Sequence, residues 1–218
     1  MYAFGYDKNN NNHKILMIFY DKRNYYQIYD LKSDSWRDFN DIPSWDIDFY
    51  HGSASVNGNS YFWTKERILV ESSDEDDTPN FLICFDFTAE RFGQFLPLPF
   101  DYKSDDYGTL SCVKEEKLAA LYMRWGSVEM EIWVTTKIEP NQVLWSNFKK
   151  VAMEPHFTCN FRLNHEAGSF FFDQEKKVAM GFGLDRSDCC KIKAFIIGEN
   201  RHLKKVGLGN VVITFLPT

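Results

Sequence analysis

The sequence lacks several features that would place it in a specialised class of protein. No apolar run approaches 18 residues, which excludes a transmembrane helix. Residues 1–7 contain neither a basic region nor an apolar core, so we expect no signal peptide. The five cysteines are an odd number and do not match the even-numbered framework of a small secreted domain. We therefore expect a cytoplasmic or nuclear protein with no membrane partner.

Cationic residues are also in short supply. The 218 residues include 25 Lys and Arg against 31 Asp and Glu, which gives a net charge of −6. Because nucleic-acid affinity comes mainly from Lys and Arg contacts to phosphate, we expect no nucleic-acid partner. A local basic patch stays open as a possibility at Lys204 and Lys205 with His202.

Motifs for catalysis, cofactors or metals are equally scarce. The sequence has no Gly-x-Ser-x-Gly elbow and no Cys-x-x-Cys. The most metal-like cluster is His156 and Cys159 with His165, and its fourth ligand would have to come from the distant Cys189 or Cys190. Scattered loop and core residues explain this set more simply. We predict no catalytic residue, no cofactor and no metal, and hence a protein that is not an enzyme.

Aromatic residues are what the sequence has in excess, at 17% of the chain. Aromatic side chains favour the half-buried, pleated surface of a β-sheet. Most apolar runs are short, rich in β-branched or aromatic residues, and bounded by turn residues, which is the pattern of many short strands. Examples are residues 14–20, 25–29, 81–87 and 131–135.

An internal repeat organises these strands. The segment that begins at residue 25 aligns without a gap on the segment that begins at residue 81. Tyr29 then corresponds to Phe85, and Trp36 to Phe92. Asp30 and Asp86 also correspond, and a recurring acid of this kind is typical of a turn residue that accepts hydrogen bonds within its own hairpin.

Two more copies of the repeat follow. The third places Trp133 at the first aromatic position and Trp145 at the second, and the weaker fourth copy has Leu203 at the second position. The second positions are therefore 56, 53 and 58 residues apart. Regular spacing of this size is comparable to the kelch repeat of about 50 residues.

A second pattern precedes three of these copies, beginning at His51, Gly108 and Ala167. Each instance has a small-residue start, a short strand, a tight polar turn and a second strand. Each unit is therefore two hairpins, or four strands. We predict an all-β fold for residues 1–218, a kelch-like β-propeller or partial propeller of about four antiparallel blades. Residues 114–123 are good helix formers, but the repeat places them in a turn and a strand.

We predict an incomplete ring, or one that closes imperfectly. At about 55 residues a blade, 218 residues are too few for the closed propeller that we expect of such a protein. We also expect residues 14–20 to lack a preceding inner-strand partner. Exposed strand edges would then favour self-association.

The propeller topology sorts the loops between two faces. Tight polar turns lie on one face, whereas longer loops, including residues 41–50, 99–107 and 154–165, lie on the other. Long loops on a rigid scaffold commonly carry function, and exposed aromatic residues and Arg are common interface anchors. The alternative is that the aromatic side chains fold back to cover the sheet ends. The predicted partner-binding residues on the long-loop face are Trp45, Tyr50, Tyr102, Tyr107, Arg124, Trp125 and Phe157.

The motifs YAFGYD, IYDLKSDSWRDF, FLICFDFTAERFG followed by LPLP, and EIWVTTKI resemble the plant F-box-associated domain. They occur in the family's order from Tyr2 to about Gly209. The resemblance implies the substrate receptor of an SCF-type ubiquitin ligase, in which an F-box binds a Skp-type adaptor and the associated domain binds the protein to be ubiquitinated. This sequence has no F-box and lacks the family's usual first segment, so the resemblance implies a single F-box-associated domain, either a fragment of a longer protein or a short relative without an F-box. We expect that the chain does not join a ligase alone.

A second class of function stays open, because propellers also host carbohydrate-binding and oxidase-like proteins. Sugar binding requires exposed aromatic rings beside acids, which Trp45 with Asp46 and Asp48 could supply. A glycan array would distinguish this class from a protein-binding module. A copper oxidase requires converging Tyr and His ligands, and of the five His only His51 lies at a repeated inner-strand position.

Overall fold

The computed structural model describes residues 1–19, 25–40, 43, 45–48, 51–66, 79–152, 161–162, 169–173, 175–176, 178–185, 188–197 and 203–210. These residues form antiparallel strands and turns, with no α-helix among them. None of the described segments is a helix of the length and apolar character required to cross a membrane. The all-β prediction is confirmed.

The described strands form four sheets that follow one another along the chain. The first sheet contains β1 (Tyr2–Asp7), β2 (Asn12–Phe19), β3 (Tyr25–Asp30) and β4 (Ser35–Phe39). The second sheet contains β5 (Trp45–Ile47), β6 (Ser53–Val56), β7 (Asn59–Glu66), β8 (Asn80–Asp86), β9 (Arg91–Phe92) and β10 (Leu96–Pro97). The third contains β11 (Tyr107–Val113), β12 (Lys117–Met123), β13 (Glu129–Glu139) and β14 (Gln142–Ala152). The fourth contains β15 (Phe161–Arg162), β16 (Ser169–Asp173), β17 (Val178–Asp185), β18 (Asp188–Ile197) and β19 (Leu203–Asn210).

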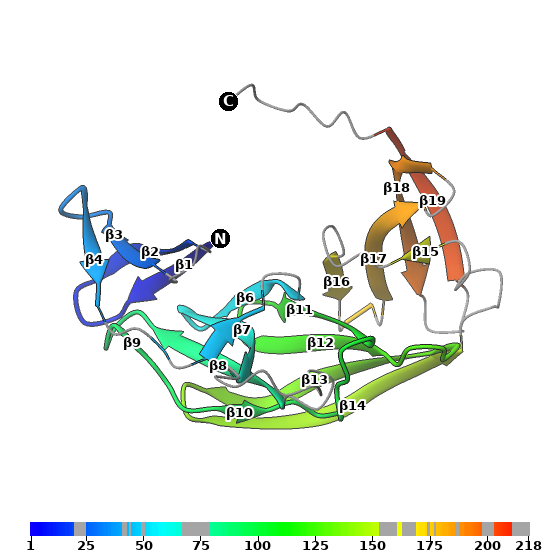
Figure 1. Ribbon diagram of the computed structural model, residues 1–218, viewed down its shortest axis with the longest axis horizontal. Coiled ribbons are helices and arrows are strands. Elements are labelled where there is room, and N and C mark those ends of the chain that lie inside the picture. The colour runs from blue at the N-terminus through cyan, green and yellow to red at the C-terminus, as the bar shows by residue number, and fades with distance from the viewer. Residues whose placement is uncertain are drawn as a thin grey trace, which may run out of the picture.

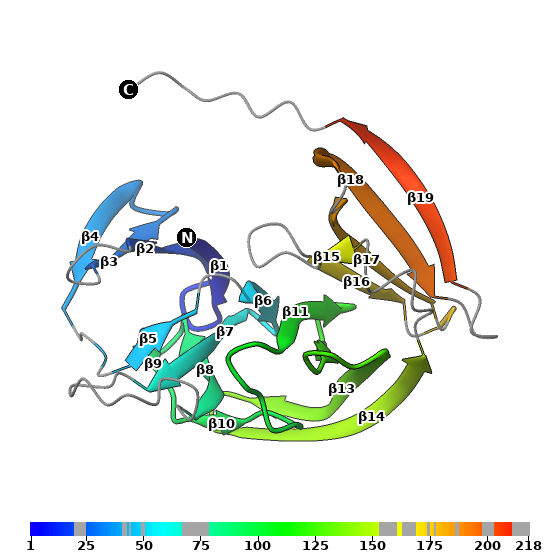
Figure 2. The ribbon, with the colours of Figure 1, turned by 45° about the vertical axis from the view of Figure 1, so that its right-hand side comes forward.

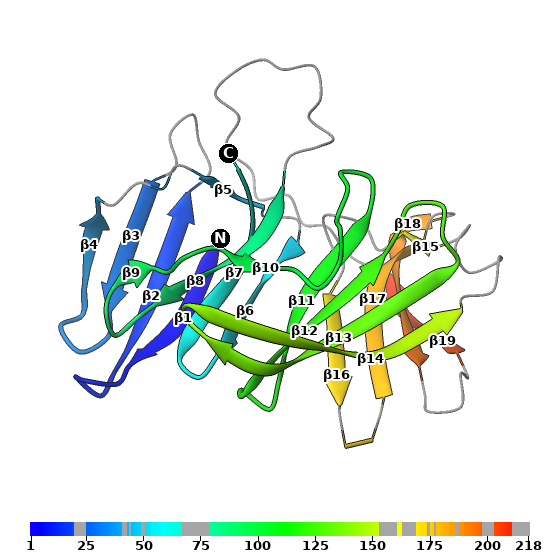
Figure 3. The same ribbon diagram turned by 90° about the horizontal axis from the view of Figure 1, so that it is seen from below.

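The four sheets are arranged as the blades of a partial propeller. Figures 1 and 2 show an arc with the first sheet at one end, the fourth at the other, and an opening between them. Seen from below in Figure 3, β1–β4, β6–β8, β11–β14 and β16–β19 follow one another across the molecule. The repeat predicts about four antiparallel blades, and the described residues form four.

One expectation about the first blade was wrong. Residues 14–20 were expected to lack a preceding strand, but β1 pairs with β2 from Tyr2 opposite Met17 to Asp7 opposite Asn12. The reason lies in the alternation along β1, where Ala3 and Asp7 are buried and Tyr2 is exposed. Such alternation is typical of a strand with one packed face.

The repeat is visible as cross-strand pairs. Tyr29 lies opposite Trp36 in the first sheet, and Phe85 lies opposite Phe92 in the second, as the alignment predicts. In the third sheet Trp145 lies opposite Thr135, so Thr135 rather than Trp133 holds the first aromatic position. The assignment of Trp133 was therefore wrong by two residues. Two irregularities in the β13–β14 register shift the pairing in this hairpin, which lengthens it relative to the first two copies.

Recurring acids close the hairpin turns, as predicted. The Asp30 carboxylate accepts hydrogen bonds from the backbone nitrogens of Lys32 and Ser33, both at 3.0 Å. The Asp86 carboxylate accepts the corresponding pair from Thr88 and Ala89 at 2.9 and 3.0 Å. The same two-bond arrangement occurs at Asp7 and Asp173. These acids are therefore turn residues, as the sequence predicts.

The segment of helix formers is a turn followed by a strand. Lys114 and Glu115 have positive φ angles of 51° and 60°, and β12 follows at Lys117. Leu118 and Leu121 on β12 are fully buried, as are the two alanines between them. Burial on both faces of β12 stabilises the strand by more than the modest helix preference of these residues.

Hydrophobic cores lie between neighbouring sheets, one at each of the three junctions in the arc. Two glycines allow the close approach that these junctions require. A Cβ on Gly108 would lie 2.5 Å from Cη2 of the buried Trp63, and a Cβ on Gly5 would lie 2.0 Å from the ring of Phe87. Gly108, which opens one instance of the second pattern, and Gly5 therefore leave space for aromatic rings of the adjacent sheet.

Candidate functional site

The candidate site is the loop face, by which we mean the surface around Asp48 and residues 98–106 and 124–128. These segments lie at the ends of strands opposite to the tight turns at residues 57–58 and 114–116. We call the opposite side, which carries these turns, the turn face. Its turns are connected from one sheet to the next by backbone hydrogen bonds. Tyr6 N donates to Gly58 O and Asn57 N donates to Glu115 O, both at 2.8 Å. The scaffold under the loop face is thereby fixed across three sheets.

Asp106 is the centre of the hydrogen-bond network on the loop face. Its buried carboxylate accepts hydrogen bonds from Trp125 N at 2.8 Å, from the Tyr122 hydroxyl at 2.9 Å and from Lys103 N at 3.0 Å. One carboxylate therefore joins the loop of residues 98–106 to the loop of residues 124–128. The sequence gives no indication of this role, since Asp105 and Asp106 look alike there.

A second set of contacts joins the first of these loops to the segment around Asp48. The Tyr102 hydroxyl donates to Asp106 O at 2.6 Å and lies 2.5 Å from His51 Nε2. On the other side of the imidazole, His51 Nδ1 lies 3.0 Å from a carboxylate oxygen of Asp48. The imidazole stacks on Trp63 with ring centroids 4.6 Å apart. Three segments of the second and third sheets are thus held by one connected polar network above Trp63.

Several aromatic residues predicted to bind a partner are buried in this arrangement. Trp45, Tyr102 and Tyr107 are all less than a tenth exposed. Trp45 packs edge-on against Phe92 with centroids 4.9 Å apart, and Tyr107 lies in the core between the third and fourth sheets. These side chains follow the alternative considered from sequence, in which aromatic rings cover the sheet ends. Burial raises the pKa of Tyr107 well above its usual value.

Two predicted residues do project from the loop face. Trp125 is 67% exposed, the largest exposed fraction among the large hydrophobic side chains of the described residues, and Arg124 is exposed beside it. A hydrogen bond with the Tyr122 hydroxyl raises the pKa of Arg124 above its already high value. The remaining two, Tyr50 and Phe157, lie outside the described residues.

The surroundings of Trp125 are acidic. Asp101, Asp105 and Glu129 are exposed, and Lys103 Nζ lies 3.8 Å from the Asp101 carboxylate. The surface therefore combines a large aromatic ring and one guanidinium with several carboxylates.

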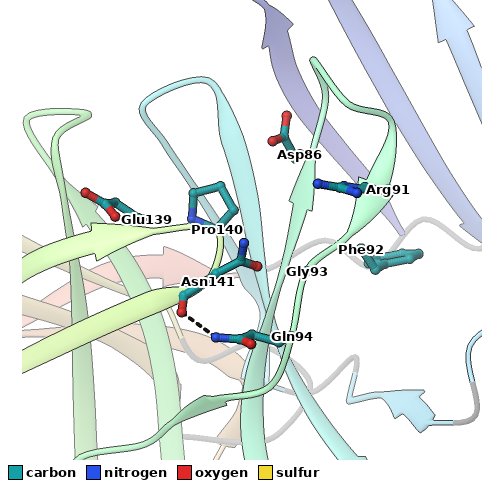
Figure 4. A pocket seen from close by; sticks show the side chains of 8 residues that line it. All are labelled: Asp86, Arg91, Phe92, Gly93, Gln94, Glu139, Pro140 and Asn141. Atoms are coloured by element: carbon teal, nitrogen blue, oxygen red, sulfur yellow. Dashed lines mark hydrogen bonds between the residues drawn. The ribbon is translucent and has the colours of Figure 1, made fainter.

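Two hollows lie on the turn face. One, of about 390 Å³, is lined by the residues drawn in Figure 4, where Gln94 donates to Asn141 O at 2.6 Å. Its polar lining includes Asp86, Arg91 and Glu139. A larger hollow of about 830 Å³ lies near the axis, between Phe4, His13, Cys112 and the turns of the second and third sheets. Sequence reasoning did not identify either hollow.

The described residues contain no group of three His, Cys, Asp or Glu side chains placed to hold a metal ion. Most of the metal-like set picked from sequence, including His156, Cys159 and His165, lies outside those residues. Trp45, proposed above as a platform for a sugar, is only 6% exposed.

Comparison with known proteins places this geometry in context. A family model described as the F-box associated beta propeller domain matches residues 1–218. Among curated proteins, F-box protein At3g19880 of Arabidopsis thaliana is 57% identical over 95% of this chain and 54% of its own length. F-box protein At3g19890 is 48% identical over 97% of this chain and 52% of its own length, and F-box/kelch-repeat protein At4g05080, also from A. thaliana, is 46% identical over 98% and 53%. This chain thus spans about half the length of these relatives.

Among solved structures, a mutant of AofleA from Arthrobotrys oligospora aligns with a TM-score of 0.49 and 10% identity, over 96% of this chain and 58% of the other. Similarity at this level adds nothing to the account of the fold or of the site.

Proposed function

The chain belongs to the F-box associated beta propeller domain family, and from that membership we propose that it is the substrate-binding domain of an SCF-type ubiquitin ligase receptor. The observation that carries the proposal is the family match over residues 1–218, together with relatives named as F-box proteins. In the longer protein, an F-box outside these 218 residues would bind a Skp-type adaptor. The domain itself would perform no chemistry and would only hold the protein to be ubiquitinated.

The loop face is the surface that we propose for this binding. Asp106 fixes the backbone at Trp125 before any partner arrives, so ordering the loop costs little entropy on binding. Trp125 would be the buried anchor of the interface and Arg124 its polar neighbour. Anchors of this type commonly contribute about 2–4 kcal/mol to binding when they are truncated to alanine.

We further propose that the recognised segment is basic or neutral. The protein carries a net charge of −6, and exposed Asp101, Asp105 and Glu129 surround Trp125. Complementary charge speeds association and rejects acidic competitors. Raising the salt concentration should therefore slow association more than it changes dissociation.

The test is affinity purification from plant extract with the 218-residue chain as bait. Wild type is compared with Arg124→Ala/Trp125→Ala on the loop face. Lys114→Ala/Lys176→Ala on the turn face is the matched control, since both lysines are exposed. Captured proteins are identified by mass spectrometry, and their ubiquitination is compared in plants with and without the full-length protein.

We expect the loop-face variant to lose the proteins that wild type and control both capture, and those proteins to be less ubiquitinated when the full-length protein is absent. Loss of partners in the control alone would place binding on the turn face. Unchanged ubiquitination of every captured protein would contradict the role in a ligase while leaving the binding role intact.

A further inference from the structure

The outer face of the first sheet, the face turned away from the second sheet, is rich in exposed aromatic rings. Because side chains alternate along a strand, one face of β1–β4 packs into the core shared with the second sheet, through residues such as Leu16 and Ile28. The opposite face carries rings that are 43% to 66% exposed. They belong to Tyr2, Phe4, Phe19, Tyr25 and Trp36.

The carboxylates on this outer face already have partners. The Tyr25 hydroxyl donates to Asp38, which also accepts a hydrogen bond from Gln27 Nε2 at 2.9 Å. The Tyr29 hydroxyl donates to Asp34. Because these acids are hydrogen-bonded within the sheet, their burial under a partner would cost less than the burial of unpaired carboxylates.

The repeat shows what kind of surface this is. Tyr29 holds the position of Phe85 in the second sheet, and Met17 lies opposite Gln27 just as Phe62 lies opposite Ile83. Phe62, Ile83 and Phe85 are at most 1% exposed, because they pack against the first sheet. The outer face of the first sheet is therefore the positional equivalent of a face that, one blade later, is a sheet-to-sheet interface.

The surface that would pack against this outer face is the forward face of a sheet. By forward face we mean the face that packs against the next sheet along the chain. In the second sheet that face includes Ala54 of β6. Phe171 holds the equivalent position in the fourth sheet, two residues before the end of β16, and it is 57% exposed. Phe170 and Phe172 point the other way and pack against the third sheet. Among the described sheets, the fourth is the one whose forward face has no sheet following it.

We propose that the outer face of the first sheet docks onto the forward face of the fourth sheet of a second copy of this chain. Figures 1 and 2 place these two sheets at opposite ends of one open arc, so two copies in head-to-tail contact would face each other's ends. Two such contacts would close a ring of eight sheets, and closed propellers commonly have four to eight blades. This inference goes beyond the proposed function.

The available area suits such a contact. Five aromatic side chains about half exposed offer roughly 500 Å² of surface, which lies near the upper end for a patch on a soluble monomer. A standard interface buries about 800 Å² on each partner, and a closed two-copy ring contains the contact twice. In this ring both copies would present Trp125 on the same side, which would give the proposed binding face two anchors.

Sedimentation equilibrium of the 218-residue chain over a range of concentrations tests the proposal. Tyr2→Ser/Trp36→Ser removes two rings of the outer face, and Phe171→Ser removes the ring opposite. The control Phe95→Ser/Leu144→Ser removes two exposed hydrophobic side chains elsewhere, 49% and 51% exposed in wild type. Far-UV circular dichroism checks that every variant is folded.

We expect a dimer for wild type and control, and at least a tenfold increase in the dissociation constant for each docking variant. Mixing the two docking variants should partly restore association, because one of the two contacts in a mixed dimer then joins two unaltered surfaces. A monomeric wild type, association unaffected by Phe171→Ser, or a mass that keeps growing beyond two copies would overturn the proposal.

Discussion

Asp106 holds Trp125 in place on the loop face: the Asp106 carboxylate accepts a hydrogen bond of 2.8 Å from the Trp125 backbone nitrogen. The same carboxylate is only 2% exposed, whereas the Trp125 ring is 67% exposed. A buried acid thus fixes the backbone beneath an exposed anchor. This relationship explains how a loop without regular secondary structure could keep one conformation for binding.

Replacing Asp106 should therefore weaken both the fold and the loop. Asp106→Ala removes the acceptor of three hydrogen bonds and leaves the buried Tyr122 hydroxyl without this partner. We expect the free energy of unfolding to fall by about 2–4 kcal/mol in urea titrations. Asp105→Ala, at the exposed neighbouring position, should change it by less than about 0.5 kcal/mol. Equal losses for the two variants would contradict the role given to Asp106.

Two buried tyrosines allow a matched comparison of hydroxyl groups. Tyr102→Phe removes the hydroxyl that joins His51 to the loop of residues 98–106, so we expect a loss of about 1–3 kcal/mol. The Tyr107 hydroxyl is buried with no hydrogen-bond partner among the described residues. Tyr107→Phe should therefore be neutral or slightly stabilising. Thermal unfolding of both variants provides the measurement, and a larger loss for Tyr107→Phe would be inconsistent with this network.

The contact between Gly108 and Trp63 can be tested by a double-mutant cycle. Gly108→Ala places a Cβ 2.5 Å from a fully buried indole ring that stacks on His51 and cannot easily move. We expect it to destabilise the fold by about 1–3 kcal/mol. Trp63→Phe leaves a smaller ring, so adding Gly108→Ala in that background should cost less. Strictly additive free energies from urea titrations would mean that the two residues do not compete for space.

A buried ion pair within the first sheet, between Asp7 of β1 and Lys14 of β2, predicts a pH dependence. Burial by itself would raise the pKa of Asp7, but hydrogen bonds from Lys14 Nζ at 2.5 Å and from Asn10 outweigh it and hold that pKa far below its usual range. A depressed pKa in the folded state stabilises the fold above the unfolded pKa of about 4 and loses that contribution at lower pH. We expect the stability difference between wild type and Asp7→Asn to be constant above about pH 5 and to shrink below about pH 4.

Equilibrium unfolding of both proteins from pH 6 to about pH 2.5 provides this measurement. A stability difference that stays unchanged down to the lowest pH would show that the Lys14 contact does not favour the charged form of Asp7.

The sequence was sufficient for the fold because its repeat has a physical origin. Aromatic residues pair across the outer hairpin at the same positions in the first two sheets, Tyr29 with Trp36 and Phe85 with Phe92, so the same residue types recur at regular spacing. Counting failed where the backbone departs from regular pairing. At β13 the irregular register moves the aromatic position from Trp133 to Thr135, and no residue type in that segment indicates this shift.

The site was less predictable than the fold. An aromatic residue in a loop can cover the core or face a partner, and the choice depends on contacts from distant parts of the chain. Tyr102 turns inward because His51, 51 residues away, supplies a polar contact for its hydroxyl. Trp125 projects outward because Asp106 holds its backbone rather than its ring. Neither partner can be identified from local sequence.

Site-specific photo-crosslinking tests most directly the central claim that the loop face binds a protein partner. A photoreactive amino acid replaces Trp125 on the loop face or Lys114 on the turn face of the 218-residue chain. Each of the two proteins is then irradiated in plant extract. We predict that position 125 crosslinks to a protein that wild type also captures by affinity purification, whereas position 114 does not. Crosslinks to that protein from position 114 and none from position 125 would contradict the account.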